Sequence, residues 1–129
     1  MAGEPAIPER YRRGMRYEVT EADTAAAVGS GEVAVLATPR LLAWLEAATL
    51  QAVAPLVSAE RTTVGTAVRV KHRRPSPVGA PVEVTAHAPD SVDDHRVTCS
   101  VWAVDEHGTV LADGEIDRAI VDRSQFPAP

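Results

Sequence analysis

The spacing of apolar residues predicts one long helix in the first half of the chain. From Thr38 to Pro55, apolar residues recur three and four positions apart, as they do on one face of a helix. Thr38 is expected as the N-cap and Pro39 as the first helical residue, while Pro55 ends the helix. The apolar face comprises Leu41, Leu42, Leu45, Thr49, Ala52 and Val53. The face opposite to it carries Arg40, Trp44, Ala47 and Gln51.

Alternating, Val-rich runs elsewhere in the chain predict strands. One run, 15–20, precedes the helix, and a short helical turn within 21–31 follows that run. Four more runs, separated by turn signals, follow the helix over 62–74, 82–88, 96–104 and 109–121. Gly108 is placed for a hairpin turn and Gly114 for a bulge in the last run. This order predicts an α+β fold whose sheet covers one side of the helix, and a partner subunit would close the other side or the sheet edge.

Composition narrows the class of protein. A chain of 129 residues fits one domain, which we expect over 15–126 after a flexible lead-in over 1–14. The net charge of -5 argues against nucleic acid as a partner, and no stretch approaches the roughly 20 apolar residues of a membrane span. The single cysteine, Cys99, excludes an intrachain disulfide and fits the cytoplasm. Zinc-ligand spacings, phosphate loops and dinucleotide motifs do not occur in the sequence, so neither a metal nor a cofactor is expected.

Two polar residues interrupt predicted apolar faces. Glu46 falls inside the apolar sector of the helix, where a carboxylate is costly unless it is paired or functional and where burial raises a carboxyl pKa. It either reaches solvent from the shoulder of that sector or takes part in chemistry. His72 shares a strand face with Val68 and Val70, which are expected to point to the core. Such a histidine is either a hydrogen-bonded core residue or a proton-transfer group.

The helix start and a basic strip are candidate binding sites. Capping alone explains Thr38, yet its hydroxyl and the free N–H groups beside it would also suit a developing oxyanion. Eight residues of straight helix place Thr38 and Glu46 about 12 Å apart along the axis, so they serve one substrate only across two subunits or through an irregular first turn. The basic strip, which is either a solvated strand face or a surface for the phosphates of coenzyme A, consists of Arg69, Lys71, Arg73 and Arg74.

Three stretches in this order resemble the fluoroacetyl-CoA thioesterase family: VLATPRLLAWLEAATLQAVAPL, TTVGTAVRVKHRRPSPVG and IDRAIVDRSQF, all between Val33 and Phe126. The resemblance implies a hotdog fold, which is an antiparallel sheet wrapped around one long central helix, and an acyl-CoA substrate. It also implies a homodimer with active sites at the subunit interface, and stacking of two dimers into a tetramer stays open. The family pattern gives catalytic roles to Thr38, Glu46 and His72. Together with the interpretation of the basic strip as a surface for CoA, it leads us to expect substrate contacts from Pro39, Gly65, Arg69, Lys71, Arg74 and Arg118.

The sequence departs from that family in two places. The fluoroacetyl-specific enzyme carries phenylalanine in a lid segment before the helix, whereas TEADTAAAVGSGEVAV has no aromatic residue, and the family's last-strand histidine is replaced by Ile116. We therefore expect hydrolysis of a short acyl-CoA without selectivity for fluoroacetyl-CoA, with Thr38, Glu46 or water as the attacking group. The alternative is a non-catalytic module that binds acyl-CoA or a small acyl ligand. Hydration of an enoyl thioester is a weaker rival.

Overall fold

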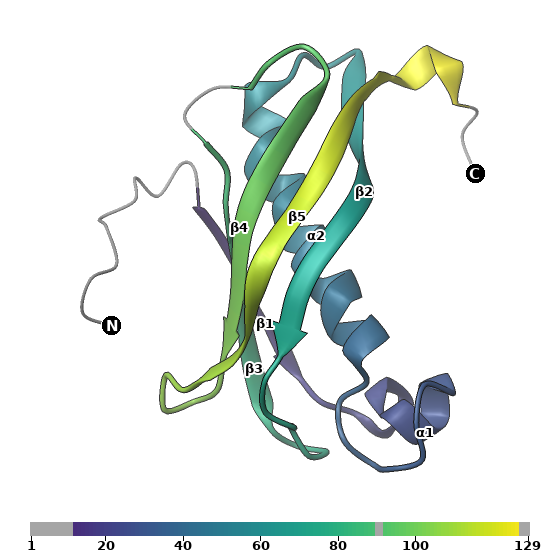
Figure 1. Ribbon diagram of the computed structural model, residues 1–129, viewed down its shortest axis with the longest axis vertical. Coiled ribbons are helices and arrows are strands. Elements are labelled where there is room, and N and C mark those ends of the chain that lie inside the picture. Colours follow the sequence, from purple (N-terminus) through teal and green to yellow (C-terminus); the bar gives the residue numbers. More distant parts are fainter. Residues whose placement is uncertain (1–11, 90–91, 127–129) are drawn as a thin grey trace.

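The computed structural model describes residues 12–89 and 92–126, which form one antiparallel sheet around a single long helix (Figure 1). The strands are β1 (Arg12–Glu18), β2 (Arg61–His72), β3 (Pro81–His87), β4 (Arg96–Val104) and β5 (Val110–Asp122). The helices are α1 (Ala25–Val28) and α2 (Thr38–Val53), with 3-10 turns at Glu21–Asp23, Ala54–Leu56 and Arg123–Gln125. The predicted α+β class is confirmed. Of the expected lead-in, residues 1–11 lie outside the described residues, and residues 12–14 already belong to β1.

The strand order decides which backbone edges stay open. The strands lie in the order β1-β3-β4-β5-β2, and every neighbouring pair is antiparallel. Helix α2 crosses one face of this sheet (Figure 1). The outer strand β2 ends beside the first turn of α2, where His72 meets Thr38, and it begins beside the last turn, where Arg61 and Leu50 line one hollow. One exposed sheet edge therefore follows the helix from end to end.

Helix α2 buries a wider face than its periodicity predicts. Its buried residues are Leu41, Trp44, Leu45, Ala48, Thr49, Ala52 and Val53. The prediction that Trp44 lies on the face opposite the core is wrong, because β1 packs against that side and the ring of Tyr17 stacks on the indole with centroids 4.2 Å apart. The predicted N-cap is wrong by one residue. Ala37 is the N-cap, so the hydroxyl of Thr38 has no capping role.

Strand β2 contains a bulge that sets the direction in which the side chains at its end point. Its pairing with β5 shifts between Gly65 and Ala67, which makes Thr66 the extra residue. Gly65 faces α2. Successive residues of a regular strand alternate between faces, so without the extra residue His72 would point away from α2. The bulge restores its inward direction.

The predicted bulge at Gly114 is wrong. Strand β5 passes through Gly114 with regular pairing on both sides, opposite Val70 and Val101. Glycine is required there for another reason, because a Cβ atom would overlap the backbone of Arg69 and Val70 and because φ is +157°. Gly114 marks a close approach of two backbones.

The segment between β1 and α2 forms a cap over the start of α2. Thr24 caps helix α1 with its side chain, and Gly29 ends that helix with φ of +90°. Backbone hydrogen bonds fasten the segment: the N–H of Ala25 donates to Val35, and the N–H of Ala37 donates to Asp23. The start of α2 is therefore fixed by the residues that precede it.

The remaining sequence features have simple structural outcomes. Cys99 is buried in the core as predicted, and its burial raises the thiol pKa to about 11. Within residues 12–89 and 92–126, no helix is long and apolar enough to cross a membrane. The same residues hold no group of three or more His, Cys, Asp or Glu side chains arranged to bind a metal ion.

Candidate active site

A hydrogen-bonded threonine and histidine lie at the start of α2. The Oγ1 atom of Thr38 is 2.7 Å from Nδ1 of His72, which comes from the end of β2, 34 residues later. Both residues were single candidates in the sequence, and the fold brings them together. A hydroxyl that donates to a neutral imidazole is the arrangement of an activated nucleophile and its base.

The environment of His72 favours its neutral form. The side chain is half-buried, and this burial lowers the pKa of the imidazole below its usual 6.5. Its Nε2 atom is buried and has no hydrogen-bond partner among the described residues. His72 is therefore set up to accept a proton at Nδ1 near neutral pH.

An open hollow of about 610 Å³ lies against this pair. The cap segment contributes Ala25, Val33 and Val35 to its lining, and Thr38 and His72 also line it. The other lining residues are Ser30, Gly31, Leu36, Pro39, Arg73, Arg74 and Pro75. Volumes of this size are typical of sites for small ligands. The lining is small and mostly apolar near the hydroxyl, and basic toward the end of β2.

A second polar cluster occupies the middle of α2, around Glu46 and Arg118. The guanidinium of Arg118, from β5, is almost completely buried and lies 3.6 Å from the carboxylate of Glu46. It donates to the hydroxyl of Thr63 at 2.7 Å, to the carbonyl of Thr63 at 3.0 Å and to the hydroxyl of Thr49 at 3.2 Å. The Glu46 side chain stays 41% exposed. Glu46 is thus both paired with a buried cation and accessible to solvent.

Gly65 makes room for that carboxylate. A Cβ atom at Gly65 would collide with Oε2 of Glu46, and the next nearest side chain is that of Arg118. Its backbone does not occupy the left-handed region, so a larger residue here would disturb the position of the Glu46 carboxylate and not the backbone conformation. Gly65 therefore belongs to the Glu46–Arg118 cluster.

The two clusters are separate within one chain. Thr38 and Glu46 lie on the same regular helix, and eight residues of helix rise about 12 Å. The first turn of α2 is helical from Thr38 onward, so no local irregularity shortens this distance. Of the sequence-predicted residues, the structure joins Thr38 with His72 and Glu46 with Gly65 and Arg118.

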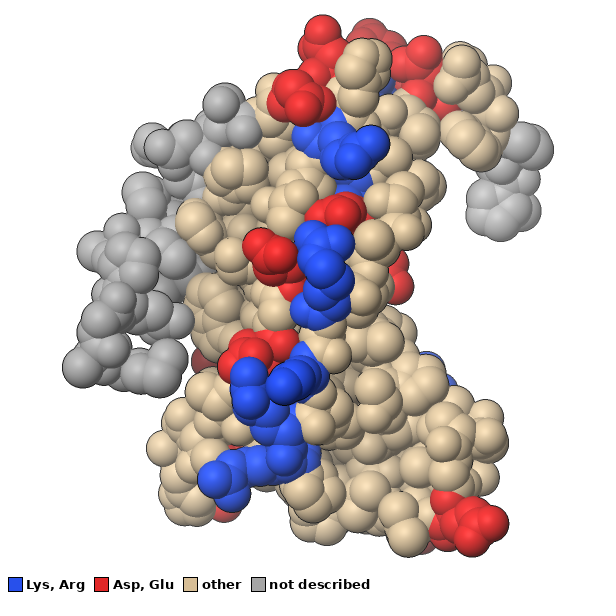
Figure 2. Space-filling view, viewed as in Figure 1, with Lys and Arg blue, Asp and Glu red and all other residues tan. Residues whose placement is uncertain are grey.

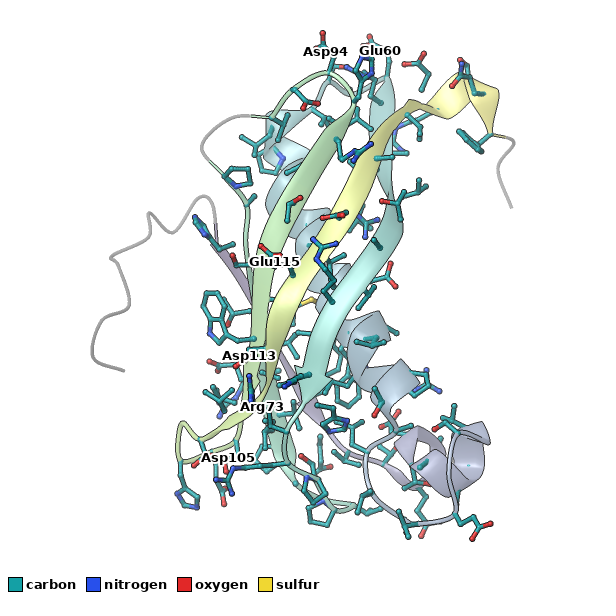
Figure 3. All side chains as sticks on the ribbon, in the orientation of Figure 1. Glu60, Arg73, Asp94, Asp105, Asp113 and Glu115 are labelled. Carbon is teal, nitrogen blue, oxygen red and sulfur yellow. The ribbon has the colours of Figure 1, made fainter. Side chains whose placement is uncertain are left out.

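The basic strip is largely neutralised along the outer face of the sheet. Figure 2 shows Lys and Arg side chains in a line over this face with acidic side chains beside them. Arg69 binds Asp117 at 2.8 Å and Glu115 at 3.4 Å, and its hydrogen bond lowers the pKa of Asp117 to about 2. Arg73 and Asp113 point toward one another (Figure 3) and form two 3.0 Å hydrogen bonds.

Two cations of the strip keep their charge available. Lys71 and Arg74 form no ion pair with any described residue. Arg74 also lines the hollow beside the Thr38–His72 pair. An anionic group of a ligand in that hollow would therefore meet Arg74 before it met Arg69.

Sequence reasoning missed the partners of Arg118. Thr49 and Thr63 precede it by 69 and 55 residues, and neither stands out in a pattern of apolar positions. Thr49 could have indicated these contacts, because it is a polar residue predicted on the apolar face of the helix. A buried hydroxyl there requires a polar partner.

Comparison with known proteins agrees with this architecture. The family model of the fluoroacetyl-CoA-specific thioesterase matches residues 19–124. No curated protein matches the chain. A mutant of the fluoroacetyl-CoA-specific thioesterase, solved in complex with fluoroacetate and CoA, is 27% identical with a TM-score of 0.77, over 90% of this chain and 96% of that chain.

Two bacterial structures share the fold at lower identity. A thioesterase superfamily member from Thermus thermophilus is 24% identical with a TM-score of 0.80, over 95% of this chain and 89% of that chain. A hot-dog-like protein from Thermanaerovibrio acidaminovorans is 22% identical with a TM-score of 0.74, over 92% of each chain. The predicted hotdog fold is confirmed.

Proposed function

Since the chain belongs to the fluoroacetyl-CoA-specific thioesterase family, we propose that it hydrolyses a short acyl-CoA thioester to the free acid and CoA, at a site shared by two subunits. The main support for this proposal is the 2.7 Å hydrogen bond between Thr38 and His72. Both residues line the hollow of about 610 Å³. A nucleophile with its base, next to a helix N-terminus, suits attack on a carbonyl carbon.

The chemistry follows from the groups around Thr38. Its oxygen attacks the thioester carbonyl as the hydroxyl proton passes to Nδ1 of His72. The N–H groups of Thr38 and Arg40 have no partner within the first helical turn, so they stabilise the negative charge on the carbonyl oxygen. The carbon–sulfur bond then breaks, and the thiolate of CoA takes the proton from His72. Water, deprotonated by a general base, hydrolyses the acyl ester and regenerates the hydroxyl.

A homodimer supplies that general base. The open edge of β2 exposes Val64 and Val68, and Leu50 of α2 is exposed beside it. Two such edges can pair about a two-fold axis that leaves both helices on the same face of the joined sheet. The two β2 strands are then antiparallel, so the end of one β2 lies toward the start of the other. Glu46 of the partner subunit then approaches the Thr38–His72 pair from across the interface. Its pairing with Arg118 fixes the orientation of the carboxylate.

The CoA moiety extends along the end of β2. Arg74 and Lys71 have the free charge that phosphate groups require, whereas Arg69 is already bound to two carboxylates. Pro39 lines the same hollow and borders the thioester. The neighbour solved with fluoroacetate and CoA makes CoA a reasonable ligand for this fold. A cytoplasmic location, where acyl-CoA is available, belongs to the same proposal.

One observation favours a second candidate, a module that binds acyl-CoA without hydrolysing it. Ile116, at the position of the family histidine, is completely buried in the core under α2. That position therefore has no polar group to offer to a reaction. A binding module would use the same hollow and the same cations.

Thiol release from a panel of acyl-CoAs, short to long and including aryl and halogenated members, separates the two candidates. The wild-type protein would be compared with the Glu46→Gln variant. The thioesterase is supported if the wild type releases thiol fastest from short acyl-CoAs and the variant releases none. Absence of release across the panel, together with saturable thermal stabilisation by acyl-CoA, would support the binding module.

A further inference from the structure

A second hollow, of about 320 Å³, lies at the opposite end of β2. Two arginines line it, Arg61 from the start of β2 and Arg123 from the turn after β5. Its hydroxyl groups come from Ser58, Thr62 and Thr63, and its apolar lining comes from Leu50, Ala54 and Val57. Two guanidinium groups, several hydroxyls and apolar side chains in one hollow suit a ligand with a short apolar body and an anionic end.

The charge in this hollow is only partly compensated. Nε of Arg61 lies 3.7 Å from the carboxylate of Asp122, and the same guanidinium donates to the carbonyl of Asp94. Arg123 donates from Nε to the carbonyl of Ala59 at 3.0 Å and has no carboxylate partner among the described residues. The stem of Arg123 is therefore held while its two terminal nitrogens remain available to a ligand.

The hollow borders the Glu46 cluster. Thr63 lines it and also accepts hydrogen bonds from Arg118, which pairs with Glu46. Leu50 follows Glu46 by one helical turn, about 6 Å along the axis. An acyl group whose carbonyl lies near Glu46 can thus extend toward Arg123 along this face of α2.

The two-subunit site of the proposed function, on which this inference rests, joins both hollows. Antiparallel pairing of two β2 edges directs the start of one β2, with Arg61, toward the end of the other, with His72 of the partner subunit. A substrate then has CoA on the side of Arg74 and its acyl end on the side of Arg123. We propose that Arg123, with Arg61, binds a carboxylate at the far end of the acyl group, so that the preferred substrates are CoA thioesters of short dicarboxylic acids.

The test compares acyl-CoAs of equal length with and without the terminal carboxylate: succinyl against butyryl, and glutaryl against pentanoyl. We expect the wild-type kcat/KM to be roughly tenfold or more higher for the dicarboxylic member of each pair, the size of effect of one charge-assisted contact. Arg123→Gln should remove this preference and leave butyryl-CoA turnover within about twofold. Arg16→Gln, at an exposed arginine far from this hollow, is the matched control and should keep the preference.

Other outcomes overturn the assignment. An equal loss with all four substrates would mean that Arg123 binds the phosphates of CoA, and no preference in the wild type would exclude a carboxylate site. If no acyl-CoA is hydrolysed, the proposed function fails, and calorimetric Kd values for glutaryl-CoA and pentanoyl-CoA decide this inference separately. A glutaryl preference that Arg123→Gln removes supports it, and equal Kd values contradict it.

Discussion

Helix α2 presents two polar clusters to the same strand, and they differ in how completely their hydrogen bonds are satisfied. Thr38 and His72 share one hydrogen bond, and Nε2 of His72 has no described partner. Arg118, by contrast, donates to Thr63 and Thr49 and pairs with Glu46 while buried. The first cluster borders the open hollow of about 610 Å³, whereas in the second the guanidinium of Arg118 is buried and the carboxylate of Glu46 stays accessible.

The two clusters are suited to different roles, one to reaction and the other to support of the fold. A weakly partnered hydroxyl and a neutral imidazole can exchange protons with a substrate at little cost to the fold. A buried guanidinium with all of its neighbours in place is costly to disturb, because loss of one partner leaves the others unsatisfied. Substitutions in the first cluster should therefore change turnover, whereas removal of the buried guanidinium from the second should change stability.

The largest effect is expected for Thr38→Ala. Loss of the hydroxyl should lower kcat/KM roughly 10²–10⁴-fold, the contribution of a positioned nucleophile and base. Thr38→Ser keeps the hydroxyl and should retain most of the activity. Because Thr38 is exposed and caps nothing, the melting temperatures of both variants should stay close to that of the wild type. Equal activity of Thr38→Ala and the wild type would remove Thr38 from the chemistry.

The second cluster should respond to Arg118→Met with a loss of stability. Removal of the guanidinium leaves Thr63, Thr49 and Glu46 without their donor, and we expect the free energy of unfolding to fall by roughly 2–4 kcal/mol. Urea denaturation measures this change. The matched variant Arg69→Met removes an exposed ion pair and should cost about 1 kcal/mol or less. Equal losses in the two variants would contradict the supporting role of Arg118.

Gly65→Ala tests the orientation of Glu46, because it changes the position of the carboxylate without removing a charge. The added methyl group would overlap the carboxylate and should displace it, with a loss of about tenfold in kcat/KM. Gly14→Ala is the control, since its nearest neighbours would lie at 3.7 and 3.8 Å, in ordinary contact. Unchanged activity in Gly65→Ala would show that the orientation of Glu46 is not needed.

The smallest effect concerns pH. Burial disfavours the imidazolium form and lowers the pKa of His72, so the side chain should stay neutral somewhat below pH 6.5. Activity that needs neutral His72 is then present above that lowered pKa and lost as pH falls through it. The acid limb of kcat/KM should have its midpoint below 6.5, and His107→Gln, at an exposed histidine, should leave the limb in place. A midpoint above 6.5 would contradict a buried neutral base.

Patterns in the sequence predicted the elements but not all of their contacts. Hydrophobic periodicity and the Thr-Pro pair predicted the start of α2 to within one residue, and strand alternation predicted that His72 faces inward. Those features depend on local spacing. Trp44 was assigned to the wrong face, because periodicity does not reveal that β1 covers a second side of the helix.

The missed features depend on strand register. The bulge at Thr66 depends on how β2 pairs with β5, some fifty residues later, and glycine spacing pointed to Gly114 instead. The family resemblance supplied Arg118 as a substrate contact, whereas the structure surrounds it with Thr63, Thr49 and Glu46. Contacts between residues this distant in the chain do not produce a periodic pattern of apolar positions in the sequence.

The most direct test of a site shared by two subunits is complementation between Thr38→Ala and Glu46→Gln. Each variant alone should be inactive, and the two are mixed, unfolded and refolded together before thiol release is measured. If Thr38 of one subunit works with Glu46 of the other, random reassociation should restore about a quarter of wild-type activity, because half of the dimers are mixed and each mixed dimer has one intact site. A mixture as inactive as its components would contradict the shared site.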